Sequence, residues 1–507
     1  MLFNSYEFIF LFLPVTLLIY VILVHNRKKE AAMTWLVLAS LFFYGWWNPV
    51  YLLLIIGSML FNYYTGVQLS NRQNRLILGI AIAVNLGLLG YFKYANFFVE
   101  NISNLAGLGW NIEHIVLPLA ISFFTFQQIA YLVDAYRRET SEYNFLHYAL
   151  FVSFFPQLIA GPIVHHKEML PQFIRETARS IEYRHLAIGI SIFILGLFKK
   201  VVVADSLAPY SIETFDAVAG GEMLTFFEAW KGALAYTFQL YFDFSGYSDM
   251  AIGLAMLFGI RLPLNFDSPY KASSIIQFWQ RWHITLSRFL RDYLYIPLGG
   301  NRKGQFRRYL NLMVTMLLGG LWHGAEWTFV LWGGLHGIYL GVNHGWRRIK
   351  EVFGFSHYHP LYHIGSRLLT FFVVVVAWVF FRAEDVSAAK LMLKSMFAYG
   401  GVVWPVDVRD QLGNLADYLM SIGMQFGYVE YFNGLHNLLG MLAIMLFVFI
   451  SPNVQQLMSR YRAVINPPSE SRLYWCPDLK WGLAVGVMAL IAVLKLGQLS
   501  EFLYFQF

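Results

Sequence analysis

Residues 319–327 read GGLWHGAEW, and residues 332–337 read WGGLHG. Two histidines, His323 and His336, stand here among glycines and tryptophans in a strongly apolar chain. Glycine lets a neighbouring helix, or a long thin ligand, approach the backbone closely. Histidine titrates near neutral pH, so it can take a proton from an attacking hydroxyl. The segment makes His323 the first candidate for a catalytic residue.

Helical geometry predicts which neighbours share a face with His323. Glu326 and Trp327 follow it by three and four residues, so on one continuous helix all three lie on the same face. His336 lies about 220° further around an ideal helix, so the two histidines need not meet. Polar residues commonly cross-link membrane helices. From position alone this structural role is slightly favoured for His323, and it is favoured for His336 as well.

The composition is that of a membrane protein. Of the 507 residues, 58% are hydrophobic and 13% are charged, whereas a soluble domain carries about 25% charged residues. The mean hydropathy is +0.51, which leaves too little polar surface to cover a soluble core. The net charge of +7 comes from short basic clusters between apolar runs, such as Arg347-Arg348. Such clusters are typical of loops retained in the cytoplasm and argue against nucleic-acid binding.

Apolar runs predict an all-α, polytopic protein with about eleven transmembrane helices, where a full crossing needs about 20 apolar residues. The twelve candidate segments are residues 8–24, 33–47, 51–67, 76–92, 115–133, 187–203, 224–240, 310–331, 335–342, 368–381, 435–450 and 481–496. Residues 145–163 and 275–296 are too short or too polar to cross fully, so we expect re-entrant or interfacial helices there. Residues 400–434 are predicted to form an amphipathic segment on one membrane face. Without a repeat or an appended domain, residues 1–507 are expected to form a single membrane domain.

A second polar stretch covers residues 277–293 (QFWQRWHITLSRFLRDY). His283 stands among arginines, whose charge disfavours its protonated form. Arg288 and Asp292 are four residues apart and are predicted to pair. An interfacial amphipathic helix explains this stretch as well as a functional site does.

A third polar stretch, residues 241–249 (YFDFSGYSD), holds two carboxylates, Asp243 and Asp249. They invite an acid/base interpretation, but nothing in their spacing brings them together. Helix capping is therefore the better prediction for this stretch.

Several catalytic signatures are missing from the sequence. It has no Gly-x-Ser-x-Gly elbow, no His-Glu-x-x-His, no Walker loop and no dinucleotide fingerprint. The sequence therefore predicts no metal site and no bound cofactor. Residue chemistry alone leads to a histidine-based membrane site facing a polar cavity. A transporter and a non-catalytic polymer-export scaffold remain as alternatives, although no two-fold repeat of broken helices supports a transporter.

The chain resembles the membrane-bound O-acyltransferase (MBOAT) family, and within it the bacterial alginate O-acetylase, AlgI-like subfamily. The resemblance rests first on Trp322-His323-Gly324, Trp332-Gly333 and His336-Gly337. Further matching stretches are residues 1–5 (MLFNS), 10–14 (FLFLP), 118–137 (PLAISFFTFQQIAYLVDAYR), 160–163 (AGPI), 243–249 (DFSGYSD), 265–271 (NFDSPYK) and 278–302 (FWQRWHITLSRFLRDYLYIPLGGNR).

The resemblance implies the MBOAT fold, a ring of transmembrane helices with re-entrant and interfacial helices around a central tunnel. It implies that the invariant family histidine is His323 and that the second, variable polar position is His283. Both are expected to be catalytic. The residues that we expect to bind substrate or donor around them are Trp322, Trp327, Arg302, Arg281, Asp292, Ser287 and His336.

The resemblance also implies an O-acetyltransferase of the bacterial inner membrane. It would take acetyl from a cytoplasmic thioester, with acetyl-CoA as donor substrate, and pass it to a periplasmic SGNH-type partner of the AlgJ, AlgX or PatB kind. That partner would acetylate an exported polysaccharide such as alginate or cellulose, with peptidoglycan as the alternative acceptor.

For the mechanism, we expect the anionic end of the donor near Arg302, Lys303 and Arg307. His323 is expected to act as general base, with His283 orienting the thioester or stabilising the oxyanion. A transient acetyl-histidine is the less favoured variant.

Overall fold

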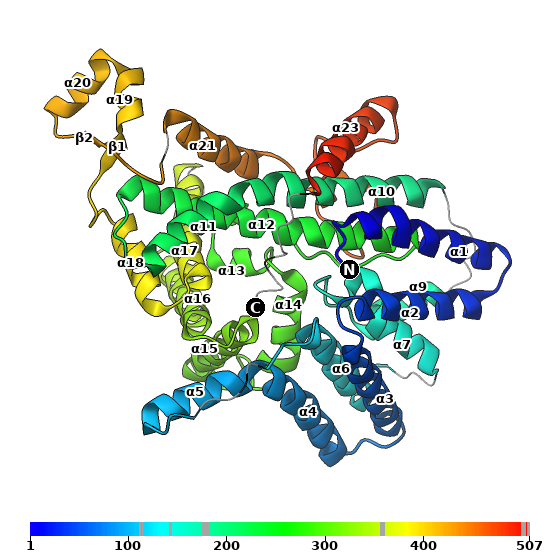
Figure 1. The fold of residues 1–507 in the computed structure, drawn as a ribbon. Helices are drawn as coiled ribbons and strands as arrows, with labels where there is room; N and C mark the ends of the chain where they lie inside the picture. The colour runs from blue at the N-terminus through cyan, green and yellow to red at the C-terminus, as the bar shows by residue number, and fades with distance from the viewer. Residues whose placement is uncertain are drawn as a thin grey trace. The chain divides into compact units, whose positions relative to one another are not determined.

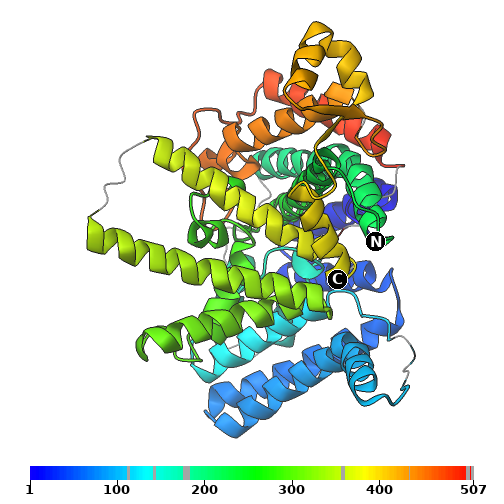
Figure 2. The ribbon, with the colours of Figure 1, turned by 90° about the vertical axis from the view of Figure 1, so that its left-hand side faces the viewer.

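The computed structural model of the chain is built almost entirely of helices (Figures 1 and 2), which confirms the all-α prediction. It describes residues 1–110, 113, 115–140, 144–174, 183–354, 360–432, 434–497 and 503. The chain divides into two compact units, each assembled from distant segments. Described residues within 1–201, 245–265 and 454–503 form unit 1, and those within 202–244 and 266–453 form unit 2. The residues with predicted catalytic or binding roles all belong to unit 2.

Unit 1 contains the amino-terminal helices and the last helices of the chain. Its helices are α1 (Leu13–His25), α2 (Lys29–Gly45), α3 (Val50–Asn71), α4 (Arg75–Leu89), α5 (Ala95–Ala106), α6 (Ile121–Tyr136), α7 (Phe145–Ser153), α8 (Phe155–Leu158), α9 (His166–Ile174), α10 (Tyr183–Phe198), α22 (Val454–Leu457) and α23 (Leu479–Lys495). Within this unit α1 packs on α2, and α6 packs on both α3 and α4.

Unit 2 contains most of the central part of the chain. Its helices are α11 (Asp205–Ala219), the first part of α12 (Phe226–Leu257), α13 (Ile275–Trp279), α14 (Ile284–Leu290), α15 (Gly304–His323), α16 (Trp327–Phe353), α17 (Pro360–Arg382), α18 (Val386–Met396), α19 (Val406–Leu412), α20 (Asn414–Ser421) and α21 (Gly434–Ile450). Helix α16 packs against α13, α15 and α17, and α15 and α16 lie side by side in both ribbon views (Figures 1 and 2).

Among the described residues, five helical stretches are long and apolar enough to cross a membrane. They are Phe8–His25, Val50–Asn71, Arg75–Ala106, Tyr183–Ala219 and Pro360–Arg382. A shorter apolar helix covers His436–Ile450. This is fewer than the roughly eleven predicted spans, because several predicted segments form helices shorter than a full crossing, or helices with more charged residues.

The predicted span 310–331 is in fact two helices. Helix α15 ends at His323, Gly324 is extended (φ −156°, ψ 151°), and α16 begins after Glu326. The prediction that Trp327 and Glu326 share a helical face with His323 is therefore wrong. A side chain at position 324 would collide with the ring of Phe329, so only glycine permits the chain to turn here.

The stretches predicted to be broken or amphipathic are indeed irregular. Residues 145–163 hold the short helices α7 and α8, and residues 275–296 hold α13, α14 and a π-helical turn at Arg291–Tyr295. Residues 400–434 contain α19 and α20, as expected of an amphipathic segment. They also contain an unpredicted two-stranded parallel sheet, in which β1 (Val403–Pro405) pairs with β2 (Gln425–Gly427).

Asp243 and Asp249 do not cap a helix, because both lie inside α12. In unit 1, Asp249 accepts a hydrogen bond of 2.8 Å from Lys199 Nζ and another of 2.8 Å from Gln455 Nε2. A buried carboxylate needs such partners to offset the loss of water. The capping prediction is therefore wrong because Asp249 bonds to side chains that are distant in the sequence and not to the end of a helix.

Candidate active site

His323 ends α15 inside a cage of aromatic rings. Its side chain is buried, with 5% of the residue exposed. The ring centroids of Trp332 and Phe381 each lie 5.1 Å from the imidazole centroid, and that of Trp322 lies 4.9 Å away. All three rings meet the imidazole edge to face. The cage restricts the rotation of the imidazole and keeps most bulk water away from it.

Glycines make this position possible by bringing α15 and α16 together. A Cβ on Gly320 would clash with the carbonyl oxygen of Phe329, and a Cβ on Gly333 would clash with that of Met316. The glycines of the motif therefore serve close helix packing, which is one of the two roles that the sequence predicts for them. This packing fixes His323 against the side chains of α16.

His283 precedes α14 and is fully buried. Its backbone adopts a left-handed conformation (φ 44°, ψ 53°), which is uncommon outside glycine and clusters at functional sites. The residue lies outside the candidate spans, and burial lowers its pKa to about 3. The sequence predicts the neutral form correctly, but burial rather than the neighbouring arginines is the cause. The Trp322 ring centroid lies 6.2 Å from that of His283, so this indole contacts both predicted catalytic histidines.

His336 lies on α16 and is also fully buried. Trp279 Nε1 donates a hydrogen bond of 3.3 Å to His336 Nδ1, and Phe278 stacks on the imidazole at 5.9 Å with an interplanar angle of 10°. Trp332 lies 4.8 Å from His336 between ring centroids. His323 and His336 therefore sit on different helices, and Trp332 contacts both of them.

A cavity of about 300 Å³ opens beside this group within unit 2. The residues with polar groups in its lining are Trp279, Ser287, Arg291, Tyr295, Asn301, Arg308, Thr315 and His344. The rest of the wall is mostly apolar and includes Leu290, Leu312 and Met316. Trp279 thus lines the cavity with its side chain and also bonds to His336, which links the cavity to the histidine group.

Arg308, one of two arginines that line the cavity, contacts a histidine. Arg308 Nη2 lies 2.8 Å from His344 Nδ1. Burial and the nearby charges of Arg308 and Arg347 lower the pKa of His344, which keeps this imidazole neutral and able to accept the hydrogen bond. His344 therefore holds the guanidinium of Arg308 at the cavity wall.

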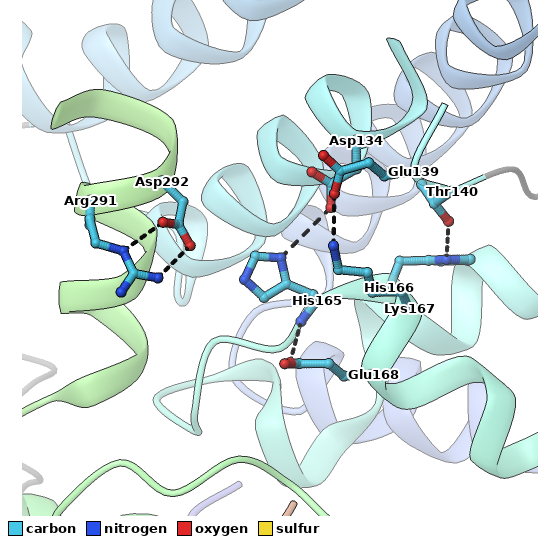
Figure 3. Close-up of polar contacts among 9 residues, drawn as sticks. All are labelled: Asp134, Glu139, Thr140, His165, His166, Lys167, Glu168, Arg291 and Asp292. Carbon is cyan, nitrogen blue, oxygen red and sulfur yellow. Dashed lines mark hydrogen bonds and ion pairs between the residues drawn. The ribbon is translucent and has the colours of Figure 1, made fainter. Parts of the chain in front are cut away.

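Two of the predicted binding residues lie at or next to this cavity. Ser287 lines it, and Asp292 neighbours the lining residue Arg291. Arg291 donates two hydrogen bonds to Asp292, of 2.7 Å from Nε and 3.1 Å from Nη2 (Figure 3). The four-residue spacing in the sequence predicts Arg288 as the partner of Asp292 and gives no indication of Arg291.

Other predicted binding residues lie elsewhere. Arg302 is exposed and does not line the cavity, and Trp327 is 56% exposed at the start of α16. Arg281 is half-buried, and its backbone carbonyl accepts a hydrogen bond from the Asp267 N–H. Its charge contributes to lowering the pKa of Lys271, after the larger effect of burial, so its side chain lies near Lys271.

Sequence reasoning gave no site role to several residues that build this region. They are Trp279, Trp332, Phe381, Arg308 and His344. Trp332 had a usable signal, because it precedes His336 by one helical turn within the quoted motif. Phe381 had none, because it belongs to an apolar run and reaches His323 only through the packing of unit 2.

Unit 1 contains a separate polar cluster around His165 (Figure 3). His165 Nδ1 lies 3.7 Å from Asp134 Oδ2, and both side chains are buried. The neighbouring His166 shares a hydrogen bond of 2.7 Å with Thr140, and Lys167 pairs with Glu139 at 2.7 Å. The cluster anchors the start of α9 to the end of α6, and sequence analysis did not single it out.

Comparison with known proteins places this region in a family. The model of the membrane-bound O-acyltransferase family matches residues 133–382, which include His283, His323 and His336. A peptidoglycan O-acetyltransferase of Helicobacter pylori is 48% identical over 432 residues, which cover 79% of this chain and 81% of that protein. The chain belongs to the membrane-bound O-acyltransferase family. This MBOAT protein is therefore a membrane-bound acyltransferase.

The MBOAT protein has further relatives with named polymer acceptors. A probable alginate O-acetylase AlgI of Pseudomonas aeruginosa is 44% identical over 412 residues, which cover 79% of this chain and 75% of that protein. A teichoic acid D-alanyltransferase of Streptococcus thermophilus is more distant, at 29% identity over 46% of this chain and 58% of that protein. The relatives thus share acyl transfer and differ in the polymer that their names specify.

Proposed function

We propose that this MBOAT protein is an inner-membrane O-acetyltransferase that takes acetyl from a cytoplasmic thioester, with acetyl-CoA as donor substrate, for O-acetylation of a polysaccharide outside that membrane. The single observation that carries this proposal is the position of His323. It is a buried imidazole at a helix end, enclosed by Trp322, Trp332 and Phe381, inside the region that matches the family. A titratable side chain is costly to bury in an apolar interior. The burial of the His323 imidazole therefore favours a catalytic role for this residue.

The cavity beside Trp279 supports the donor side of the proposal. Arg308 supplies positive charge at its wall, and Leu312 and Met316 supply apolar surface. A thioester such as acetyl-CoA joins an anionic phosphate end to a thin, less polar arm, and this cavity complements both parts. The exposed Arg302, Lys303 and Arg307 would then attract the donor rather than hold it.

In the proposed reaction His323 acts as general base. The acceptor oxygen attacks the thioester carbonyl carbon, so that the C–O bond forms and the hydroxyl proton passes to His323. The C–S bond then breaks as the tetrahedral intermediate collapses. The imidazolium then returns this proton to the leaving thiolate. His283, neutral because of its burial, orients the thioester by hydrogen bonding.

The proposal also covers the polymer that accepts the acetyl group and the partner protein that completes the transfer. The names of the relatives favour peptidoglycan and alginate as polymer classes. We expect a periplasmic SGNH-type acetyltransferase to finish the transfer, as the resemblance to the AlgI-like subfamily implies. The absence of a Gly-x-Ser-x-Gly elbow from this chain is consistent with that arrangement.

The test of the proposal is a His323→Ala variant in cells that lack the chromosomal copy. We expect loss of polymer O-acetylation while the protein stays at its wild-type level in the membrane. His25→Ala is the matched control, because His25 is an exposed residue at the end of α1, and it is expected to retain full acetylation. Wild-type acetylation with His323→Ala would refute the proposed role of His323.

The same cells identify the acceptor. Ester-linked acetate is measured separately in purified peptidoglycan and in exported polysaccharide. The fraction that loses acetate with His323→Ala, and keeps it with His25→Ala, contains the acceptor.

A further inference from the structure

Trp279 sets the tautomer of His336. An indole N–H can only donate a hydrogen bond, and the Trp279 Nε1–H donates to His336 Nδ1 at 3.3 Å. Nδ1 therefore carries no proton, and the single ring proton of His336 sits on Nε2. Phe278 stacks on the same imidazole with an interplanar angle of 10°, which holds the ring plane. His336 thus presents Nε2–H as a hydrogen-bond donor.

This donor and a second one are buried without an acceptor. His336 Nε2 and Trp332 Nε1 have no hydrogen-bond partner within the part of the chain that the structure describes. His336 is completely buried, and Trp332 is 1% exposed. Buried polar groups are almost always hydrogen-bonded in folded proteins. Two neighbouring N–H groups without a partner therefore indicate that a bound molecule supplies the acceptor.

The two donors lie next to the candidate base. Trp332 and His336 are one helical turn apart on α16, and their ring centroids are 4.8 Å apart. Trp332 also meets the ring of His323 edge to face at 5.1 Å. Trp332 therefore contacts the imidazole of His323 directly, and His336 is linked to that imidazole through Trp332.

We propose that Trp332 Nε1–H and His336 Nε2–H are a donor pair for the acyl oxygen of the thioester. The inference rests on the proposed function and adds two residues to it. As the acceptor oxygen attacks, the carbonyl π electrons move onto the acyl oxygen, and the two N–H groups hydrogen-bond to the resulting oxyanion without giving up their protons. When the carbonyl re-forms, the thiolate leaves and the same donors release the product ester. Trp279 is a positioning residue, because it acts only through His336.

The test uses variants that replace each N–H donor with an aromatic side chain that has no N–H. Trp332→Phe and His336→Phe are expressed as full-length protein with its partner, and membrane vesicles receive acetyl-CoA labelled in the acetyl group. Removing one oxyanion donor lowers kcat by about 100-fold in well-studied enzymes, so we expect a loss of that size with little change in KM. His336→Gln restores an N–H donor near the Nε2 position, and it is expected to exceed His336→Phe in kcat. Trp46→Phe, at an exposed tryptophan, is the control and is expected to match the wild type.

The split between kcat and KM separates this role from a structural one. A donor that is used only in the transition state lowers kcat with little change in KM, whereas a disturbed binding site raises KM as well. The inference is overturned by wild-type kcat in both phenylalanine variants, by a loss that appears only as a raised KM, or by equal kcat in His336→Gln and His336→Phe.

His323→Ala distinguishes this inference from the proposed function. If His323→Ala is as active as the wild type, the proposed function fails and the donor pair fails with it. If His323→Ala is inactive while Trp332→Phe and His336→Phe remain fully active, only the donor pair is wrong.

Discussion

Gly320 of α15 and Gly333 of α16 face each other with no side chain between them, so that a Cβ at either position would lie 3.2 Å from the Cα of the other. The two helices can approach this closely only because both residues lack a Cβ. This contact sets the distance from His323, at the end of α15, to Trp332 and His336 on α16. The packing of α15 on α16 and the positions of the proposed catalytic side chains therefore depend on the same two glycines.

Gly320→Ala is expected to destabilise the protein. The new methyl group would meet the carbonyl oxygen of Phe329, and overpacking of this kind costs about 1–3 kcal/mol. The thermal midpoint in detergent should fall, and acetylation should fall with it because His323 is displaced. Gly345→Ala is the control, since a Cβ there meets nothing within 4 Å and alanine favours the helix. Equal midpoints for the two variants would contradict the packing argument.

Acid is expected to weaken the wild type through His283. Burial lowers its pKa from 6.5 to about 3. Below pH 6.5 the imidazole is therefore protonated in the unfolded chain and stays neutral in the folded protein. The contribution of His283 to the free energy of unfolding is therefore fully present above pH 6.5. It is lost progressively as the pH falls from 6.5 to about 3. At pH 5 the loss reaches about 2 kcal/mol.

His283→Asn removes this titration, so its thermal midpoint should fall less than that of the wild type between pH 7 and pH 5. Midpoints are measured over that range in the same detergent. Parallel curves for the two proteins would show that His283 is not buried in its neutral form.

Arg308→Gln is expected to weaken donor binding. Arg308 lines the cavity and is held by His344, so its charge is well placed for an anionic donor. A hydrogen bond to a charged group contributes about 1.5–3 kcal/mol, which predicts a rise of about tenfold or more in the KM for acetyl-CoA at similar kcat. Arg302→Gln tests the exposed cations, and its effect should be smaller and should vanish at high salt. A larger effect at Arg302 than at Arg308 would place the anionic end outside the cavity.

Asp249→Leu is expected to destabilise unit 1. The side chains of Lys199 and Asp249 are 14% and 9% exposed, and their charged atoms are 2.8 Å apart. Removing one partner of a buried ion pair costs about 3–5 kcal/mol, because the remaining charge stays buried. The double variant Lys199→Met/Asp249→Leu should recover much of the lost thermal midpoint. A double variant as unstable as Asp249→Leu alone would argue against an ion pair.

The sequence predicted the all-α membrane class and the irregular stretches well. Hydropathy and length report directly on which segments can be helical, and internal Pro, Gly and charged residues report where those segments break. Residues 145–163 and 275–296 are irregular for that reason. The break at Gly324 was missed, because apolar residues on both sides of it continued the pattern of a single span.

The candidate site was only partly accessible from the sequence. His323 stood out by its motif, and the neutral state of His283 was predicted although its cause was not. Trp279 and Phe381 reach the histidines from α13 and α17, and no spacing in the sequence encodes such a contact. The wrong prediction of a shared face for His323 and Trp327 has the same origin, since it assumed one continuous helix.

The sequence by itself determined that this chain is an all-α membrane protein, because composition suffices for that conclusion. It made His323 the first catalytic candidate only through the resemblance of its motifs to a known family. Only the tertiary structure decided that Trp332 joins His323 to His336, that Trp279 fixes the proton of His336 on Nε2, and that Arg308 faces a cavity while Arg302 does not. These relationships link residues on different helices. They arise from how helix surfaces pack, and periodicity within a single helix carries no information about that packing.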